Sequence, residues 1–266
     1  MRLPRLPDLL TTANLACGVA SILLASQGQL TWACGLVFAA AVFDVLDGVA
    51  ARAMGGGTPL GAQLDSLADL VSFGVAPALL VFVQSSTLAV NLVDMSAFPE
   101  GVPARIPHPN AVPDWPIMFG AIVLVIASCW RLAKFNLDTR QSTGFLGLPT
   151  PSNGLFWVSV VLVSLNVAIH PGPGHNMLAG LVVEMLTTNY VLLMLCVGMA
   201  ALMLSELPLP GLKFQHFRWQ GNQVIYLLAG IGAVLAVLYG ILAVPLILVV
   251  YVFSPLWGKV FPTAVS

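Results

Sequence analysis

The chain has 266 residues, of which 58% are hydrophobic and only 8% are charged, and its formal net charge is −1 at pH 7. Because about a quarter of the residues in an ordinary soluble domain are charged, this composition excludes a soluble protein and indicates an integral membrane protein. The near-neutral net charge also excludes an electrostatic basis for binding nucleic acid.

Apolar runs about as long as a bilayer crossing recur along the chain and predict an all-α, polytopic membrane helix bundle of about eight transmembrane helices. The expected helices cover 9–26, 30–54, 59–90, 116–135, 152–169 and 187–204. The last apolar run, 224–257, is too long for one crossing, and Gly240 with Pro245 offers a place to divide it in two. We expect one membrane domain over 1–266, with the catalytic helices within 1–150 and additional membrane helices over 151–258.

Two segments that contain prolines interrupt this pattern. Segment 91–115 is rich in proline and predicts an irregular loop, whose role the sequence does not indicate. The segment "GLPTPSN", 147–153, is stiffened by Pro149 and Pro151, and Ser152 is expected to cap the helix that follows it. This second segment either covers a substrate site or is a plain turn before a helix.

The basic residues predict how the chain lies in the membrane. If the N-terminus is cytoplasmic, nine of the ten Lys and Arg residues fall at cytoplasmic helix ends, and only Arg105 falls outside. This positive-inside bias predicts a multi-pass protein of the cytoplasmic membrane with both termini in the cytoplasm. The turn "GGGTP", which joins the second and third helices, then lies at the cytoplasmic face.

Four of the eleven acidic residues occur beside that turn, although both flanks are apolar. Asp44 and Asp47 are three residues apart on the second helix, and Asp65 and Asp69 are four residues apart on the third, so each pair shares one side of its helix. A short turn makes the two helices antiparallel neighbours. We therefore expect the two pairs to face each other across one cleft, which opens toward the cytoplasm.

Four carboxylates near a membrane interface must be protonated, paired or bound to cations. Arg52 is the only basic residue nearby and cannot neutralise four charges, so a divalent metal is expected. The cysteines and histidines show no metal-ligand spacing, and a site with oxygen ligands alone indicates Mg²⁺ or Mn²⁺, with Ca²⁺ as an alternative. Two such ions would suit phosphoryl-group chemistry. Gly48 and Gly61 either leave room for a ligand or permit close helix packing.

These residues together resemble the signature of the CDP-alcohol phosphotransferase family. The matching positions are Asp44, Asp47, Gly48, Ala51, Arg52, Gly61, Asp65 and Asp69, and their spacing is that of the complete signature. The resemblance implies the CDP-alcohol phosphotransferase fold and an enzyme that uses two divalent ions. It implies that Asp44, Asp47 and Asp65 hold the metals, with Asp69 also near a metal.

The resemblance also implies a mechanism. Asp69 would be the general base that takes the proton of the acceptor hydroxyl, whose oxygen attacks the β-phosphorus of a CDP-linked lipid while CMP leaves. The CDP part of the donor would lie against Gly48, Ala51, Arg52 and Gly61.

Further segments are similar to phosphatidylserine synthases of the integral-membrane type. They are "LPDLLTTANLACG", "CWRLAKFN", "GFLGLPTPSNG" and "SELPLPGLKF". This likeness implies a CDP-diacylglycerol-type donor, L-serine as acceptor, Thr11 as a further donor-site residue, and a homodimer surrounded by membrane lipids. One departure is Asp8, where Asn is expected after Pro7.

A physical argument also favours serine. Its carboxylate needs a cation, and Arg131 and Lys134 stand three residues apart at the end of the fourth helix, with Asn136 just beyond. We assign these three residues and Pro149 to the acceptor site, although the two cations could equally be ordinary anchors at a helix end. The alternative acceptors are glycerol phosphate and inositol phosphate, which would need a denser basic pocket. A cation transporter is the alternative from a different class.

Overall fold

The computed structural model describes residues 5–93, 115–137, 144–169, 176–210 and 223–258. Its helices are α1 (Leu6–Ser26), α2 (Leu30–Ala53), α3 (Pro59–Asp69), η1 (Leu70–Val75), α4 (Ala76–Val93), α5 (Trp115–Leu137), α6 (Thr150–Ile169), α7 (Asn176–Thr187), α8 (Asn189–Leu204), α9 (Gln223–Tyr239), η2 (Gly240–Leu242) and α10 (Ala243–Gly258). Two short strands, β1 (Gly144–Leu146) and β2 (Pro208–Pro210), pair antiparallel. The all-α prediction is therefore confirmed, with a small strand pair that was not predicted.

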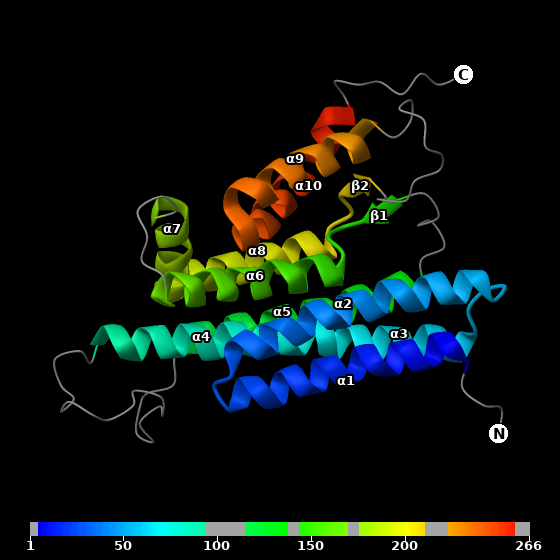
Figure 1. Ribbon diagram of the computed structural model, residues 1–266, viewed down its shortest axis with the longest axis horizontal. Helices are drawn as coiled ribbons and strands as arrows, with labels where there is room; N and C mark the ends of the chain where they lie inside the picture. The colour runs from blue at the N-terminus through cyan, green and yellow to red at the C-terminus, as the bar shows by residue number, and fades with distance from the viewer. Residues whose placement is uncertain (1–4, 94–114, 138–143, 170–175, 211–222, 259–266) are drawn as a thin grey trace.

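The helices from α1 to α5 run side by side along the long axis of the molecule, and α6 and α8 lie in a neighbouring layer (Figure 1). Among the described residues, five helical segments are long and apolar enough to cross a membrane, or six if the bent pair of α7 and α8 forms one span. This count takes α3 to α4 as one segment and α9 to α10 as another. The chain is a multi-pass membrane protein. The predicted number of eight crossings is not confirmed.

The predicted break at Gly240 is present, because α9 ends at Tyr239 and α10 begins at Ala243, but two separate crossings are not confirmed. Gly240 has φ +55, a left-handed conformation that glycine adopts without strain. A Cβ placed on Gly232 of α9 would lie 3.3 Å from Cδ1 of Ile247 on α10, although fifteen positions separate the two residues. The helices α9 and α10 therefore fold back on each other as a hairpin (Figure 1).

Several predicted boundaries were wrong. The helix α4 continues to Val93, so the predicted loop from Asn91 begins too early, and 94–114 lie outside the described residues. The helix α6 begins at Thr150, so Ser152 lies inside the helix and does not cap it. Pro151 also belongs to the helix and not to the turn before it, because a proline fits the first helical turn, where its missing N–H would have no partner.

The third predicted helix is interrupted by a π-helix, η1, which directly follows Asp69. Its neighbours on other helices approach very closely. A Cβ on Gly18 of α1 would overlap Ser72 Oγ and lie 2.8 Å from Ser72 Cα, and a Cβ on Gly154 of α6 would lie 2.9 Å from the carbonyl oxygen of Phe73. The helices α1 and α6 therefore pack tightly against this wide helical turn at two glycines, Gly18 and Gly154. Such π-helical turns are frequent at functional sites.

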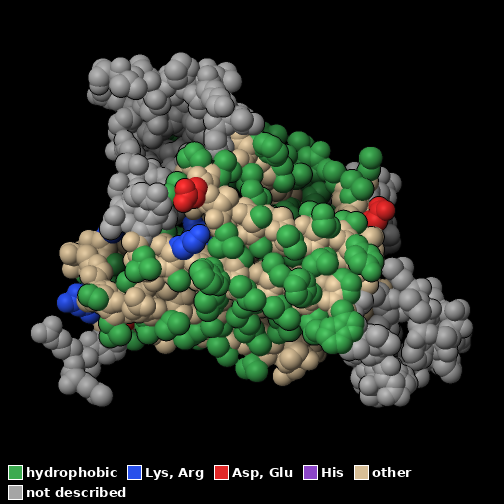
Figure 2. Space-filling model, turned by 180° about the vertical axis from the view of Figure 1, so that it is seen from behind, with side chains coloured by type: hydrophobic (Ala, Val, Ile, Leu, Met, Phe, Trp, Pro, Cys, Tyr) green, Lys and Arg blue, Asp and Glu red, His purple; other side chains and the backbone are tan. Residues whose placement is uncertain are grey.

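Buried apolar residues of most of the helices form one continuous cluster, in which Trp157 and Phe73 are the largest fully buried side chains. The outer surface is apolar as well. Figure 2 shows that hydrophobic side chains cover most of the visible described surface, while Lys and Arg side chains gather toward one end. This distribution matches a protein surrounded by lipid along its length and by water at its ends.

Gly18→Ala is expected to destabilise the protein by about 1 to 3 kcal/mol, the usual effect of overpacking a tight contact. The added methyl would overlap Ser72, whose side chain and Cα both lie in its way. Gly35→Ala is the matched control, because a Cβ there meets nothing within 4 Å. Thermal unfolding of the two purified variants in one detergent checks this expectation, and equal Tm values would contradict it.

Candidate active site

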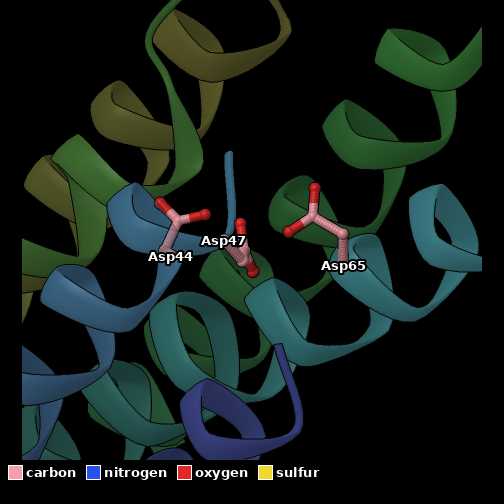
Figure 3. A group of neighbouring side chains, drawn as sticks. All are labelled: Asp44, Asp47 and Asp65. Atoms are coloured by element: carbon pink, nitrogen blue, oxygen red, sulfur yellow. The ribbon is translucent and has the colours of Figure 1, made fainter. Parts of the chain in front are cut away.

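Three carboxylates lie close together near the turn between α2 and α3. This turn was predicted to lie at the cytoplasmic face. Asp44 and Asp47 of α2 and Asp65 of α3 each offer an oxygen, and these oxygens all lie within 4.8 Å of one another (Figure 3). We call these three residues the acid trio. The turn that joins α2 to α3 contains Gly55 and Gly56 with positive φ, which lets the chain reverse within a few residues.

The helices α2 and α3 do not pack against each other as expected. Instead, α1 packs against both of them. The acids of α2 and α3 nevertheless face each other directly, with no helix between them (Figure 3). The predicted convergence of the acids is therefore present for the acid trio, but the helix that builds it is α1.

The acid trio fits a hard divalent cation. Asp47 is buried, and Oδ1 of Asp65 is buried without a hydrogen-bond partner among the described residues. A buried carboxylate oxygen without a partner is costly unless a cation or water satisfies it. All the converging atoms are carboxylate oxygens, the ligands that Mg²⁺, Mn²⁺ and Ca²⁺ prefer.

Asp69 lies one turn beyond Asp65 on α3 and is not a member of the acid trio. It is buried, and its Oδ1 accepts a hydrogen bond of 3.0 Å from Nδ2 of Asn14 on α1. Its charge interacts with those of Asp44, Asp65 and Asp47, so the four acids form one electrostatic group. Asp69, the predicted base, therefore lies outside the group of three acids whose oxygens converge most closely.

Asn14 was not predicted as a site residue. Its side chain donates to Asp69, and its backbone carbonyl accepts a hydrogen bond of 3.0 Å from the hydroxyl of Ser72 in η1. Both contacts tie α1 to the segment that carries Asp69. The signal that could have found it is an amide in an apolar helix, because such a group, once buried, needs a polar partner.

Four of the five residues predicted to bind the CDP part line a cavity of about 210 Å³ beside the acid trio, and the fifth, Arg52, is exposed and does not belong to its wall. Thr11, Gly48, Ala51 and Gly61 all contribute to its wall, together with Asp47 and Asp65. The hydroxyl of Thr11 lies 2.8 Å from Oδ2 of Asp47 and 3.0 Å from the carbonyl oxygen of Pro7, and its proton can be donated to either oxygen. Thr11 therefore contacts a trio carboxylate as well as the cavity.

The two glycines of the cavity differ in their surroundings. A Cβ on Gly61 would lie 3.1 Å from both Oδ1 of Asp8 and Oγ1 of Thr58, the residue that caps α3. A Cβ on Gly48 would meet only Nη1 of Arg52, at 3.6 Å, within the described part of the chain. Close packing within the chain thus explains Gly61 but not Gly48, where a side chain would enter the cavity.

The predicted acceptor residues separate into two groups. Arg131 is only 6% exposed, its Nε donates to the carbonyl oxygen of Leu148, and its Nη2 is buried without a partner among the residues described. Its charge also interacts with that of Asp69. Pro149 directly follows Leu148, so the "GLPTPSN" segment contacts Arg131 through its backbone.

Lys134 and Asn136 are exposed at the end of α5. The amide of Asn136 donates a hydrogen bond of 2.9 Å to the hydroxyl of Ser66 on α3, one residue beyond Asp65. Of the four predicted acceptor residues, Arg131 alone combines burial with an unpaired donor.

Comparisons with known proteins agree with this geometry. The profile of a family described as CDP-alcohol phosphatidyltransferase matches residues 5–253. A CDP-diacylglycerol–serine O-phosphatidyltransferase of Helicobacter pylori strain J99 is 31% identical over 181 residues, which cover 66% of this chain and 65% of that protein. An archaetidylserine synthase of Methanothermobacter thermautotrophicus is 34% identical over 148 residues, covering 55% of this chain and 53% of that protein.

A second Helicobacter pylori relative of the same name, from strain 26695, is 29% identical over 217 residues, covering 80% of this chain and 74% of that protein. The chain thus spans less than two thirds of the first two relatives and about three quarters of the third.

Proposed function

Because this chain belongs to the CDP-alcohol phosphatidyltransferase family, we propose that it transfers the phosphatidyl group of a CDP-diacylglycerol-type lipid to the hydroxyl of L-serine. The products are phosphatidylserine and CMP. The observation that carries this proposal is that buried Asp69 interacts electrostatically both with the acid trio and with Arg131, whose Nη2 is buried without a partner among the described residues. A candidate base is thereby coupled to both a cation site and an anion site.

The donor would occupy the cavity beside the acid trio. Gly48 leaves room for the cytidine part, and Ala51 and Gly61 form further parts of the wall. The exposed guanidinium of Arg52 lies next to Gly48 and can reach a phosphate oxygen there. The acid trio would hold a divalent cation and Asp69 would share a second, Mg²⁺ or Mn²⁺ or else Ca²⁺, and such ions neutralise the charge of the pyrophosphate when bound.

Asp69 would accept the proton of the serine hydroxyl. The hydrogen bond from Asn14 occupies Oδ1 and fixes the orientation of the carboxylate, which leaves Oδ2 for the proton. The serine oxygen then forms a bond to the β-phosphorus of the donor, and the bond between that phosphorus and the oxygen of CMP breaks. One proton moves to Asp69 and the leaving phosphate departs as CMP, so charge and atoms balance.

Arg131 would bind the carboxylate of serine. A buried guanidinium with an unpaired N–H is a strong donor to a carboxylate, and burial strengthens the contact because water does not compete. Glycerol phosphate or inositol phosphate would bring two negative charges, whereas Arg131 is the single buried cation within the described ranges. The geometry therefore favours serine over a phosphorylated acceptor.

A panel of acceptors tests the function. Purified full-length protein receives CDP-diacylglycerol with serine, glycerol phosphate or inositol phosphate, and CMP release is followed in each reaction. The expected result is CMP release that depends on serine and on a divalent cation. Release with glycerol phosphate in the absence of serine would overturn the choice of acceptor, and metal flux into vesicles without any CDP-lipid would favour a transporter.

Arg131→Lys is expected to raise KM for serine by about 10- to 100-fold, the equivalent of a charged hydrogen bond of about 1.5 to 3 kcal/mol. A lysine keeps the charge but lacks the planar fork of donors with which the guanidinium can contact both the Leu148 carbonyl and a carboxylate in fixed geometry. The KM for the CDP-lipid should stay unchanged. Lys134→Met is the comparison, with a smaller effect expected because Lys134 is exposed and screened by solvent. An effect on the donor KM alone would contradict this role of Arg131.

The proposal includes a topology and an assembly. The basic residues that the structure describes, Arg5, Arg52, Arg131 and Lys134, belong to helix ends that Figure 1 places at the same end of the bundle. This supports an active site that faces the cytoplasm, cytoplasmic termini and residence in the cytoplasmic membrane.

The proposed assembly is a homodimer. A Cβ on Gly180, Gly198 or Gly230 would meet nothing within 4 Å in the described chain, which leaves these surfaces open for the helices of a second subunit.

A further inference from the structure

A second cavity, of about 190 Å³, lies between α6, α9 and α10 and shares no residue with the donor cavity. Its wall is mostly aliphatic and includes Leu155 of α6, Leu228 of α9 and Ile247 of α10. Among the described residues of this wall, only Ser152 and Tyr251 have polar side chains. We call this cavity the apolar groove.

The apolar groove is elongated and has one polar end. Val244, Leu248 and Tyr251 of α10 lie on one helical face, and the rise from the first to the last is about 10 Å at 1.5 Å per residue. Val244 lies near the turn at Gly240, whereas Tyr251 lies toward the far end of α10. Figure 1 places that end of α10 on the side of the molecule where α6 begins and α5 ends.

The polar end of the groove adjoins Arg131. Nε of Arg131 donates to the carbonyl oxygen of Leu148, which precedes Ser152 of the groove wall by four residues, so the guanidinium lies near the polar end of the groove. The side chains of Tyr251 and Arg131 also interact electrostatically. Arg131 is nine-tenths buried and its Nη2 lacks a hydrogen-bond partner within the described structure. An apolar channel that ends at a buried cation with a free donor has the chemistry of a site for an anionic amphiphile.

We propose that the apolar groove holds one acyl chain of the product lipid, with the carboxylate of its serine head group at Arg131. The groove supplies the apolar contacts and the guanidinium supplies the charge, so a lipid with both features fits better than one with a neutral head group. This inference rests on the proposed function, because Arg131 then keeps the same carboxylate that it bound in free serine. The enzyme would hold its product after CMP has left.

Photo-crosslinking tests the inference. The purified full chain in vesicles is labelled with a phosphatidylserine that carries a photoreactive group in its acyl chain, and labelled peptides are identified by mass spectrometry. We expect labels on α6 and α10 at the residues of the apolar groove. Unlabelled phosphatidylserine should compete about tenfold better than phosphatidylcholine, a factor of ten being 1.4 kcal/mol in binding free energy.

Two variants that fill the groove test whether the labelling depends on its open space. Ile247→Trp and Leu155→Trp narrow it from α10 and from α6, and each should reduce labelling about tenfold. Val249→Trp is the matched control, because Val249 lies on α10, is 47% exposed and does not line the groove. If one groove variant fails to fold, the other tests the same wall.

Two results would overturn the inference: labelling that persists in both groove variants, or equal competition by phosphatidylserine and phosphatidylcholine. Phosphatidylglycerol is a second competitor, because its head group is anionic but has no carboxylate. If it competed as well as phosphatidylserine, binding would require only a negative charge, and this would also count against the inference. Serine-dependent CMP release is measured on the same preparations without the probe. Absence of groove labelling in the wild-type protein while transfer persists rejects the groove alone, whereas absence of transfer to serine in the wild-type protein rejects the proposed function.

Discussion

Asp69→Asn is expected to lower the rate of CMP release by about 10²- to 10⁴-fold, the range that the loss of a positioned general base produces. Asparagine has the shape of aspartate and can keep its contact with Asn14, but it cannot accept the proton of the acceptor hydroxyl. Because Asp69 is buried and lies outside the acid trio, a water molecule cannot readily take its place as the proton acceptor. Binding of the CDP-lipid should persist, because the donor cavity does not include Asp69.

The measurement is single-turnover CMP release together with equilibrium binding of the CDP-lipid. Glu184→Gln is the matched control, since Glu184 is an exposed acid of α7, which Figure 1 places at the opposite end of the bundle from the turn between α2 and α3. Asn14→Leu should give an intermediate loss with an unchanged donor KM, because it removes the orientation of Asp69 but not its charge. Full turnover in Asp69→Asn with normal donor binding would reject Asp69 as the base.

Chelation of divalent cations is expected to abolish CMP release and to lower the thermal stability of the protein. Without a cation, three carboxylates whose oxygens lie within 4.8 Å repel one another in a partly buried site. A cation at one hundred times its Kd stabilises the folded state by about 2.7 kcal/mol. Adding Mg²⁺ or Mn²⁺ back should therefore restore activity and raise Tm together.

Asp47→Asn is the variant that tests the acid trio, because Asp47 is its most buried member. It should lose most of the cation-dependent rise in Tm and lose activity, while Glu184→Gln keeps both. Tm is measured for each protein over a series of cation concentrations after thorough chelation. Activity that survives chelation, or an equal rise in Tm in wild type and Asp47→Asn, would rule out a metal at this site.

Much of the fold could be predicted because the bilayer imposes strong rules on composition. The starts of α2 and α3 at Leu30 and Pro59 were predicted to the residue, and the start of α5 to within one residue. Apolar runs, prolines and glycines report these boundaries locally. The helix α7, which is bent by 94° relative to α8, was missed because its 12 residues are too few for a bilayer crossing.

The residue types of the candidate site could also be predicted, because carboxylates at helical spacing in an apolar chain are costly unless they bind a ligand or take part in chemistry. Their partners could not be predicted. Asn14 meets Asp69 across a separation of 55 positions, and Arg131 meets Leu148 across a turn whose path the residues alone do not specify. The same limit applies to η1, whose wide turn depends on the close approach of Gly18 and Gly154.

The amino-acid sequence by itself determined that the protein lies in a membrane, where most of its helices begin and which acids share a helical face, since all of these follow from hydrophobicity and helical periodicity. Tertiary structure decided that α1 packs against both α2 and α3, that three of the four acids converge while Asp69 pairs with Asn14, and that Arg131 is buried with a spare donor. These features depend on which helices pack together, and that choice is made by side chains far apart in the chain.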